Sequence, residues 1–204
     1  MKRLWWAVLC ACVVAAGCGS DGTTLRQPAP GATAPAVPTS STTAGGQIAG
    51  QASGVATGFE LTSAAFAAGA PIPKVHTCDG QNVSPPLAWG SVPSGTVELA
   101  LTLTDPDANN YVHWVMAKVD PSVQAIAEGK VPDGVVQGTN GMNKVGWTGP
   151  CPPKGSPHHY VFTVYALTKP SGLTNGMSGK SAVSTLMQSK APTATLVGTY
   201  QRAS

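Results

Sequence analysis

The sequence predicts a mostly β domain built from antiparallel strands. Three runs of nine or ten residues alternate with period two, which is typical of a strand with one face in the core. Segments rich in Pro, Gly, Asn and Ser separate these runs, as expected of turns between paired strands. Helix-like periodicity is scarce between residues 55 and 204.

The N-terminus reads MKRLWWAVLCACVVAAGC. Lys2 and Arg3 form a short basic region, and the apolar stretch 4–16 follows. Thirteen residues are fewer than the roughly 20 needed to span a bilayer. The pattern is typical of a secretory signal peptide, which we place at residues 1–17.

Cys18 follows Ala15, Ala16 and Gly17, an arrangement that resembles a bacterial lipobox. It predicts cleavage before Cys18 and diacylglyceryl transfer to its sulfur. Ordinary signal cleavage near the same position is the alternative, and would leave a secreted protein without an anchor.

Residues 19–52 contain no aromatic residue and only two charges, so they have too little apolar surface to fold. We therefore expect residues 18–52 to form a lipidated, flexible tether. A tether favours a lipoprotein over a freely secreted protein. We therefore predict an exported protein that is anchored to the outer face of the bacterial cell membrane.

Residues 53–204 fit one domain. Beyond Cys18 the chain has ten basic and nine acidic residues, a net charge of +1 with no basic cluster, which argues against a nucleic-acid partner. Two cysteines remain in the domain, Cys78 and Cys151. In an oxidising compartment such a pair favours a disulfide over a metal pair or a nucleophile.

The expected strands cover residues 59–63, 97–105, 111–119, 158–167 and 196–202. In the second, Leu99, Leu101 and Leu103 share a face that Asp105 ends. In the third, alternation places His113 on one face, with Val115, Ala117 and Val119, and Trp114 and Met116 on the other. In the fourth, one face carries His158, Tyr160, Phe162, Val164 and Ala166. Short helices are expected near 121–128 and 182–188, the second with Ser181 or Ser184 as N-cap.

Polar residues stand at the ends of three of these strands. Asp105 ends one, His113 begins the next, and His158 with Tyr160 begins a third. A lone histidine at a strand start is more often structural than functional. If the three strands are neighbours, however, the four side chains converge on one concave, partly apolar site.

Six motifs occur in order along the chain: TCDG (77–80), SPPLAW (84–89), DPDA (105–108), HWV (113–115), GPCPPKG (149–155) and HHY (158–160). Together they resemble the phosphatidylethanolamine-binding protein family, in its bacterial branch, over residues 59–202. Asn109 departs from the pattern, because the family usually has proline after DPDA.

The resemblance implies a large central sheet rich in antiparallel pairs, a smaller flanking sheet and a few short helices. It implies a binding protein, without a cofactor, whose small pocket accepts phosphate-like anions or phospholipid head groups. It places Cys78 and Cys151 on segments that flank this pocket, and His159 where many members have arginine. The pocket residues carried over are Asp105, Asp107, His113, Trp114, Pro152, Pro153, His158 and Tyr160.

These residue types suit an anion site, because imidazole and phenol groups donate hydrogen bonds to phosphate oxygens. The aspartate would accept from a histidine N–H and so orient the ring. Backbone N–H groups of the turn 154–156 are further candidate donors.

Three rival functions use the same residues. The first rival is an enzyme, because Asp, His and Tyr are general acid–base groups. However, the sequence has no G-x-S-x-G motif, and GMSGKS (176–181) does not match a phosphate-binding loop. A disulfide would also prevent Cys151 from acting as a nucleophile. Asp105, His113 and His158 have the composition of a metal triad, which the resemblance does not imply. An interaction module that inhibits an envelope enzyme is the third rival. We expect a binding protein that is neither an enzyme nor a metal protein.

Overall fold

The computed structural model describes residues 58–203. The expected signal peptide (1–17), Cys18, the tether (18–52) and the first residues of the predicted domain lie outside this range. No helix among the described residues is long and apolar enough to cross a membrane.

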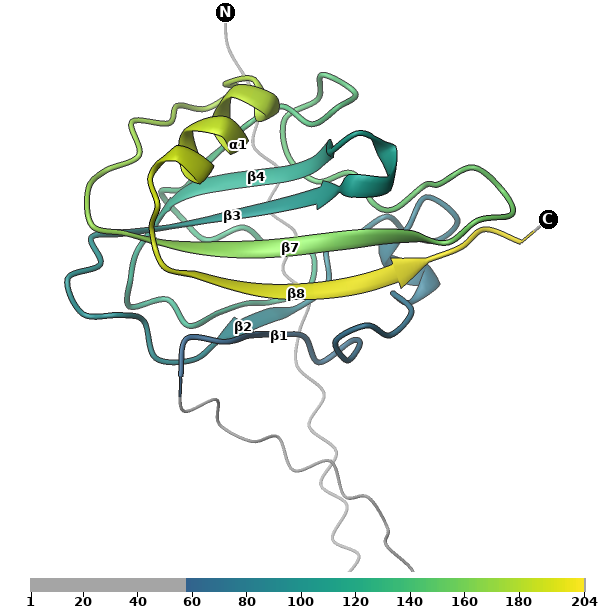
Figure 1. Cartoon of the computed structure of the whole chain (residues 1–204), viewed down its shortest axis with the longest axis horizontal. Helices are drawn as coiled ribbons and strands as arrows, with labels where there is room; N and C mark the ends of the chain where they lie inside the picture. The colour runs from purple at the N-terminus through teal and green to yellow at the C-terminus, as the bar shows by residue number, and fades with distance from the viewer. Residues whose placement is uncertain (1–57, 204) are drawn as a thin grey trace, which may run out of the picture. The chain divides into compact units, whose positions relative to one another are not determined.

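A large five-stranded sheet forms the centre of the domain (Figure 1). Its strand order is β6-β4-β3-β7-β8, and every pair is antiparallel. The sheet confirms the strands expected at 97–105, 111–119, 158–167 and 196–202. β8 begins earlier than predicted because it pairs with almost the whole of β7, from His158 opposite Tyr200 to Tyr165 opposite Thr193. The strands are β3 (Glu98–Asp105), β4 (Tyr111–Val119), β6 (Val136–Gln137), β7 (His158–Leu167) and β8 (Thr193–Tyr200).

A small antiparallel sheet has the order β1-β2-β5, with β1 at Leu61–Thr62, β2 at Leu87–Trp89 and β5 at Ala125–Ile126. The helix expected near 121–128 is wrong, because β5 occupies part of that segment. Asp120 accepts hydrogen bonds from the backbone N–H and hydroxyl of Ser122, which forms a turn. Ile126 is then buried opposite Leu87, so strand pairing overrides the local helical pattern.

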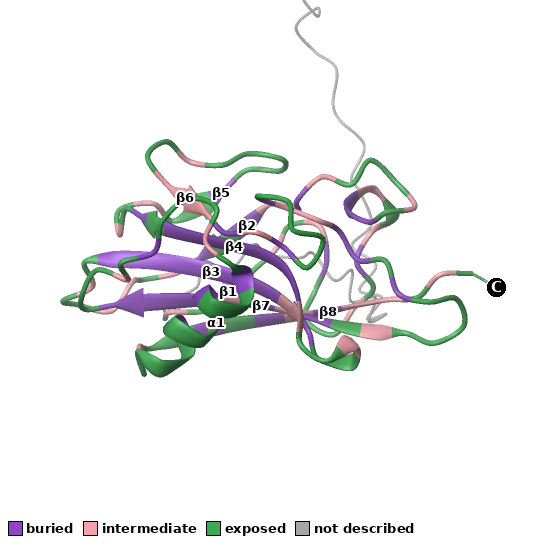
Figure 2. Cartoon of the chain, turned by 90° about the horizontal axis from the view of Figure 1, so that it is seen from above, coloured by how far each residue is buried: buried purple, intermediate pink, exposed green. Residues whose placement is uncertain are grey.

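The two faces of the large sheet are covered differently. Side chains of the small sheet, such as Leu61, Trp89 and Ile126, share one buried cluster with Leu101 and Phe162 of the large sheet. On the other face, side chains of helix α1 (Gly179–Gln188) form a second cluster with β4 and β7. β3 and β4 lie between these layers and are buried along most of their length (Figure 2).

Helix α1 confirms the helix expected near 182–188 but begins earlier. Its N-cap is Ser178, which makes no side-chain capping bond, so the predicted caps Ser181 and Ser184 are wrong. The first helical residue, Gly179, packs against the chain at Thr139, where an added Cβ would lie 2.1 Å from the carbonyl oxygen. Glycine therefore permits a close approach that extends the helix by a turn. Two 3-10 turns, Lys74–His76 and Pro106–Ala108, complete the elements.

A β-bulge in β4 changes the direction of His113. Leu103 pairs with Trp114 but the next residue, Thr104, pairs with Val112, so His113 is an extra residue in the strand. His113 consequently faces the same side as Trp114, which corrects the alternation expected from the sequence. Bulges commonly re-aim one side chain in this way.

Candidate functional site

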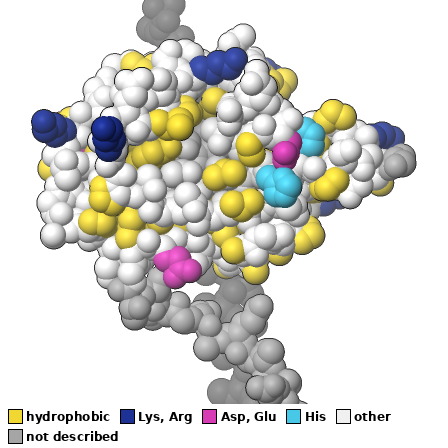
Figure 3. Space-filling view, in the orientation of Figure 1, with side chains coloured by type: hydrophobic (Ala, Val, Ile, Leu, Met, Phe, Trp, Pro, Cys, Tyr) yellow, Lys and Arg dark blue, Asp and Glu magenta, His cyan; other side chains and the backbone are white. Residues whose placement is uncertain are grey.

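A cavity of about 230 Å³ lies where β3 ends and β7 begins. On the face shown in Figure 3, two histidine side chains flank an acidic one, with hydrophobic side chains around them. The strand order places β4, β3 and β7 side by side, so the polar residues at their ends do converge. The cavity is lined by Asp105, Ala108, Tyr111, His113, Met142, Thr148, Gly149, Cys151, Pro152, Pro153, His158 and Tyr160.

Asp105 holds His158 in position. Its Oδ2 lies 2.8 Å from Nδ1 of His158, and its Oδ1 accepts a hydrogen bond of 3.0 Å from the backbone N–H of Ala108. Asp105 is only 2% exposed. Because an ionised carboxylate only accepts hydrogen bonds, Nδ1 of His158 carries the hydrogen and Nε2 is left for a ligand. The aspartate thus has the orienting role expected from the sequence.

A second pair lies beside the first but outside the cavity lining. Asp107 accepts hydrogen bonds from the backbone N–H and from Nδ1 of His159, at 2.6 and 2.8 Å. These bonds, the backbone one foremost, lower the pKa of Asp107. Both side chains are largely exposed, and His159 points away from the face that carries His158 and Tyr160, as period-two geometry requires.

His113 is held from the opposite wall. Its Nδ1 lies 2.9 Å from the carbonyl oxygen of Thr148, and the N–H of Thr148 in turn donates to the His113 carbonyl. The ring is 5% exposed and stands edge-on to Tyr160, with 5.2 Å between ring centroids. Burial, as the largest cause, lowers the pKa of His113, so the neutral ring is favoured near pH 7.

Tyr160 lines the cavity together with the two histidines. The residue is fully buried, yet its hydroxyl has no hydrogen-bond partner of normal geometry among the described residues. Burial and then the charge of Asp105 raise its pKa, so the hydroxyl keeps its hydrogen. A buried polar group without a partner is costly and rare in folded proteins. Asp105 and the backbone of Cys151 lie near the hydroxyl without forming a hydrogen bond of normal geometry, so Tyr160 is a candidate donor to a ligand.

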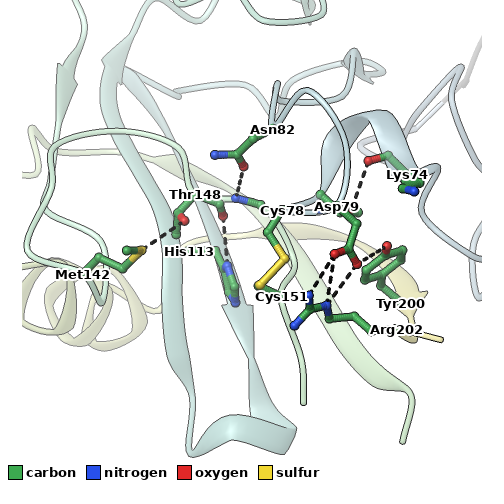
Figure 4. The surroundings of a disulfide bond; sticks show 12 residues. Lys74, Cys78, Asp79, Asn82, His113, Met142, Thr148, Cys151, Tyr200 and Arg202 are labelled. Carbon is green, nitrogen blue, oxygen red and sulfur yellow. Dashed lines mark hydrogen bonds and ion pairs between the residues drawn. A yellow bond between two sulfur atoms is a disulfide. The ribbon is translucent and has the colours of Figure 1, made fainter. Parts of the chain in front are cut away.

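The proline turn lines part of the cavity, and the predicted disulfide lies next to it (Figure 4). Cys78 and Cys151 are bonded, and the N–H of Cys78 donates to the Pro150 carbonyl. Next to the turn, the N–H of Gly149 donates to Oδ1 of Asn82 at 2.7 Å. Since Cys151 forms part of the lining, the bridge ties this wall to the segment around Cys78, and the bonded sulfur is not a free nucleophile.

The structure brings together six of the eight residues expected in the pocket. The other two, Asp107 and Trp114, do not line the cavity. Trp114 belongs to the core between the sheets: it is 1% exposed, donates from Nε1 to Gln137 and packs edge-on against Trp147. The turn 154–156 also lies outside the lining, and the N–H of Gly155 donates to the Arg202 carbonyl.

Sequence reasoning missed several lining residues. Tyr111 could have been predicted from the sequence, because it stands two residues before His113 at the start of a strand. In the structure, its ring centroid lies 4.8 Å from that of His113. Met142 and Thr148 lie on an irregular segment whose composition carries no signal. Within the described residues, no group of three or more His, Cys, Asp or Glu side chains is arranged to hold a metal ion.

In the part of the chain that the structure describes, a central antiparallel sheet is flanked by a small sheet and one helix, with a small cavity at the strand ends. This arrangement defines a class of mostly β domains with a pocket at one end of the sheet. Residues 62–201 match the family model described as phosphatidylethanolamine-binding protein. The chain belongs to this family of binding proteins.

Similar proteins agree with this assignment. The Mycobacterium tuberculosis protein named "Putative lipoprotein LppC" is 38% identical over 198 residues, covering 96% of this chain and 94% of that protein. A UPF0098 protein of Aquifex aeolicus is 39% identical over 152 residues, covering 71% and 89%.

Two solved structures are also similar. The crystal structure of E. coli YbcL, titled a new member of the mammalian PEBP family, is 33% identical with a TM-score of 0.67, covering 71% of this chain and 98% of that one. The PEBP homolog CT736 of Chlamydia trachomatis is 34% identical with a TM-score of 0.65, covering 72% and 99%.

Proposed function

We propose that this domain binds a phosphate-bearing small molecule or phospholipid head group in the cavity at the ends of β3, β4 and β7. The buried, unpartnered hydroxyl of Tyr160 is the observation that carries the proposal. The side chain lines a cavity of about 230 Å³ together with His113 and His158. The ring held by Asp105 adds an Nε2 atom that donates when protonated.

Another hollow of the domain lacks these features. It is larger, about 480 Å³, and lies between the end of β7 and α1. The buried acid nearest to it, Glu98, already accepts hydrogen bonds from Ser171 and from the N–H of Lys118. No histidine lines it. The cavity at Tyr160 is therefore the better candidate for an anion.

Removing the hydroxyl of Tyr160 tests the proposal. Tyr160→Phe is expected to weaken binding of inorganic phosphate or phosphoethanolamine by about 1.5–3 kcal/mol, the range for a hydrogen bond to a charged group. Its folding stability should stay equal or rise, because a buried unsatisfied group is removed. Isothermal titration calorimetry measures the first effect and urea unfolding the second.

Tyr165→Phe is the matched control, because Tyr165 lies on the same strand and belongs to the cluster on the helix side of the sheet. It should leave the affinity unchanged. Equal affinities of Tyr160→Phe and the unmodified protein would contradict the proposed role, and failure of the unmodified protein to bind either anion would contradict the function.

We further propose that the protein is held at the outer face of the cell membrane by lipid on Cys18. The lipobox-like sequence and the lipoprotein name of the Mycobacterium relative support this. Mass spectrometry of the native N-terminus should find acylated Cys18, and Cys18→Ser should release the protein from membranes. An unmodified N-terminus at another residue would show ordinary secretion instead.

A further inference from the structure

A methionine sulfur stands at the cavity and is hydrogen-bonded to one of its other lining residues. Met142 lines the cavity, and the residue is 56% exposed. The hydroxyl of Thr148 lies 3.7 Å from Sδ of Met142 and donates to it, because a thioether has no hydrogen to give. Thr148 lines the cavity as well. Its hydroxyl is thus a donor at the cavity whose present partner is a weak acceptor.

The turn that carries Met142 holds it in this position. The side chain of Asn140 is buried, and its Oδ1 accepts a hydrogen bond of 3.0 Å from the backbone N–H of Met142. The same side chain donates to the Gly146 carbonyl at 3.1 Å. Gly141 lies against the ring of Tyr111, where an added Cβ would come within 2.2 Å of Cε2. The sulfur therefore stands at the cavity on a braced turn.

The same sulfur is open to oxidation. Hydrogen peroxide transfers one oxygen atom to a methionine thioether and leaves as water, so the sulfur loses two electrons and the peroxide gains them. Among the described residues Met142 and Met187 are exposed, whereas Met177 is partly buried and Met116 fully buried. The two cysteines of that range form a disulfide, so neither offers a thiol to the oxidant.

Oxidation would change the partner of the Thr148 hydroxyl. In the reduced protein, a charged phosphate oxygen can take this hydrogen from the sulfur, because hydrogen bonds to ionised acceptors are much stronger than those to a thioether. The sulfoxide of Met142 is polar, and its oxygen is a strong acceptor. With that oxygen in place the hydroxyl stays paired with residue 142, and an anion in the cavity loses one donor.

We propose that Met142 is an oxidation-sensitive residue of the cavity, whose sulfoxide withdraws the Thr148 hydroxyl from a bound anion and weakens its binding. The proposal rests on the proposed function and adds a form of regulation to that site. An oxidant would release the ligand, and reduction of the sulfoxide back to the thioether would restore binding.

Treatment of the purified protein with dilute hydrogen peroxide tests the proposal. Peptide mass spectrometry should find the added oxygen at Met142 and Met187 sooner than at Met116, because Met116 is fully buried. Calorimetric titration with inorganic phosphate should show that the oxidised protein binds about tenfold more weakly, as expected from the loss of one hydrogen bond to a charged group.

Three variants, each compared with itself before and after oxidation, assign the effect to its residues. Met187→Leu should still lose affinity on oxidation, because Met187 lies outside the cavity lining. Met142→Leu should not respond, because leucine has no sulfur to oxidise. Thr148→Val should bind phosphate more weakly from the start and lose nothing further, because it has no hydroxyl to withdraw. A further loss in Thr148→Val would mean that the added oxygen acts by crowding the cavity, and would overturn the proposed mechanism.

Partial oxidation of the unmodified protein supplies a readout that does not depend on the folding of a variant. Carbon-13 NMR of the methionine methyl groups separates the thioether and sulfoxide forms of Met142 in one sample, and the sulfoxide form should saturate at a higher phosphate concentration. Equal saturation of the two forms, or oxidation of Met142 no faster than that of Met116, would overturn the inference while the anion site stands. Failure of the unoxidised protein to bind phosphate would overturn the anion site itself, and the inference with it.

Discussion

Trp114→Ala is expected to lower the free energy of unfolding by about 3–5 kcal/mol, the usual cost of removing a buried aromatic side chain. Trp114 is 1% exposed and lies in the cluster between the two sheets, where it packs against Trp147 and donates to Gln137. Its loss leaves a void that rigid neighbouring strands fill only in part. Chemical denaturation monitored by far-ultraviolet circular dichroism measures the change.

Trp114→Phe separates a core role from a pocket role if the alanine variant does not fold. It keeps much of the packing and loses the hydrogen bond to Gln137, so it should be less destabilising than alanine. Its affinity for phosphate should equal that of the unmodified protein, because Trp114 does not line the cavity. If the Trp114→Phe variant kept its folding stability but lost affinity for phosphate, Trp114 would belong to the ligand site after all.

Removing the disulfide should have the second large effect. In the Cys78→Ser, Cys151→Ser double variant, we expect a loss of about 2–5 kcal/mol of stability. The bridge closes a loop across 73 residues of sequence, for which chain entropy alone gives about 4 kcal/mol. Phosphate affinity should fall as well, because Cys151, Pro152 and Pro153 form one cavity wall. Urea unfolding and calorimetric titration measure the two effects.

Reduction of the unmodified protein provides the control, since both cysteines are exposed to solvent. Reduced protein should match the double variant in unfolding midpoint and in affinity. A double variant with full stability would mean that the Gly149–Asn82 and Cys78–Pro150 hydrogen bonds hold the turn without the bridge.

The sequence predicted those parts of the fold whose burial follows a simple period. Leu99, Leu101 and Leu103 alternate without interruption, and the strand lies where the pattern places it. The same holds for Tyr160 and Phe162 on β7. The same patterns also predicted part of the site. Asp105 ends one such strand, and His158 and Tyr160 begin another, so these side chains meet once the two strands are neighbours.

Other features depend on contacts between distant segments and could not be predicted this way. The bulge at His113 arises from the pairing of β4 with β3, and it reverses the face that alternation assigns. β5 becomes a strand because β2 pairs with it, while its own sequence has a helical pattern. Gly179 begins α1 early because Thr139, 40 residues away, packs against it. Met142 and Thr148 reach the cavity on irregular chain, where no periodicity exists.

The position of β1 has a practical consequence. The label of β1 in Figure 1 lies well apart from the end of β3, where the cavity opens. A protein coupled to a sensor chip on the β1 side of the domain would be attached at a point remote from the mouth of the cavity. Surface-based assays should therefore attach the protein on the β1 side, whereas a tag beside Tyr200 would lie close to the cavity, because Tyr200 pairs with His158.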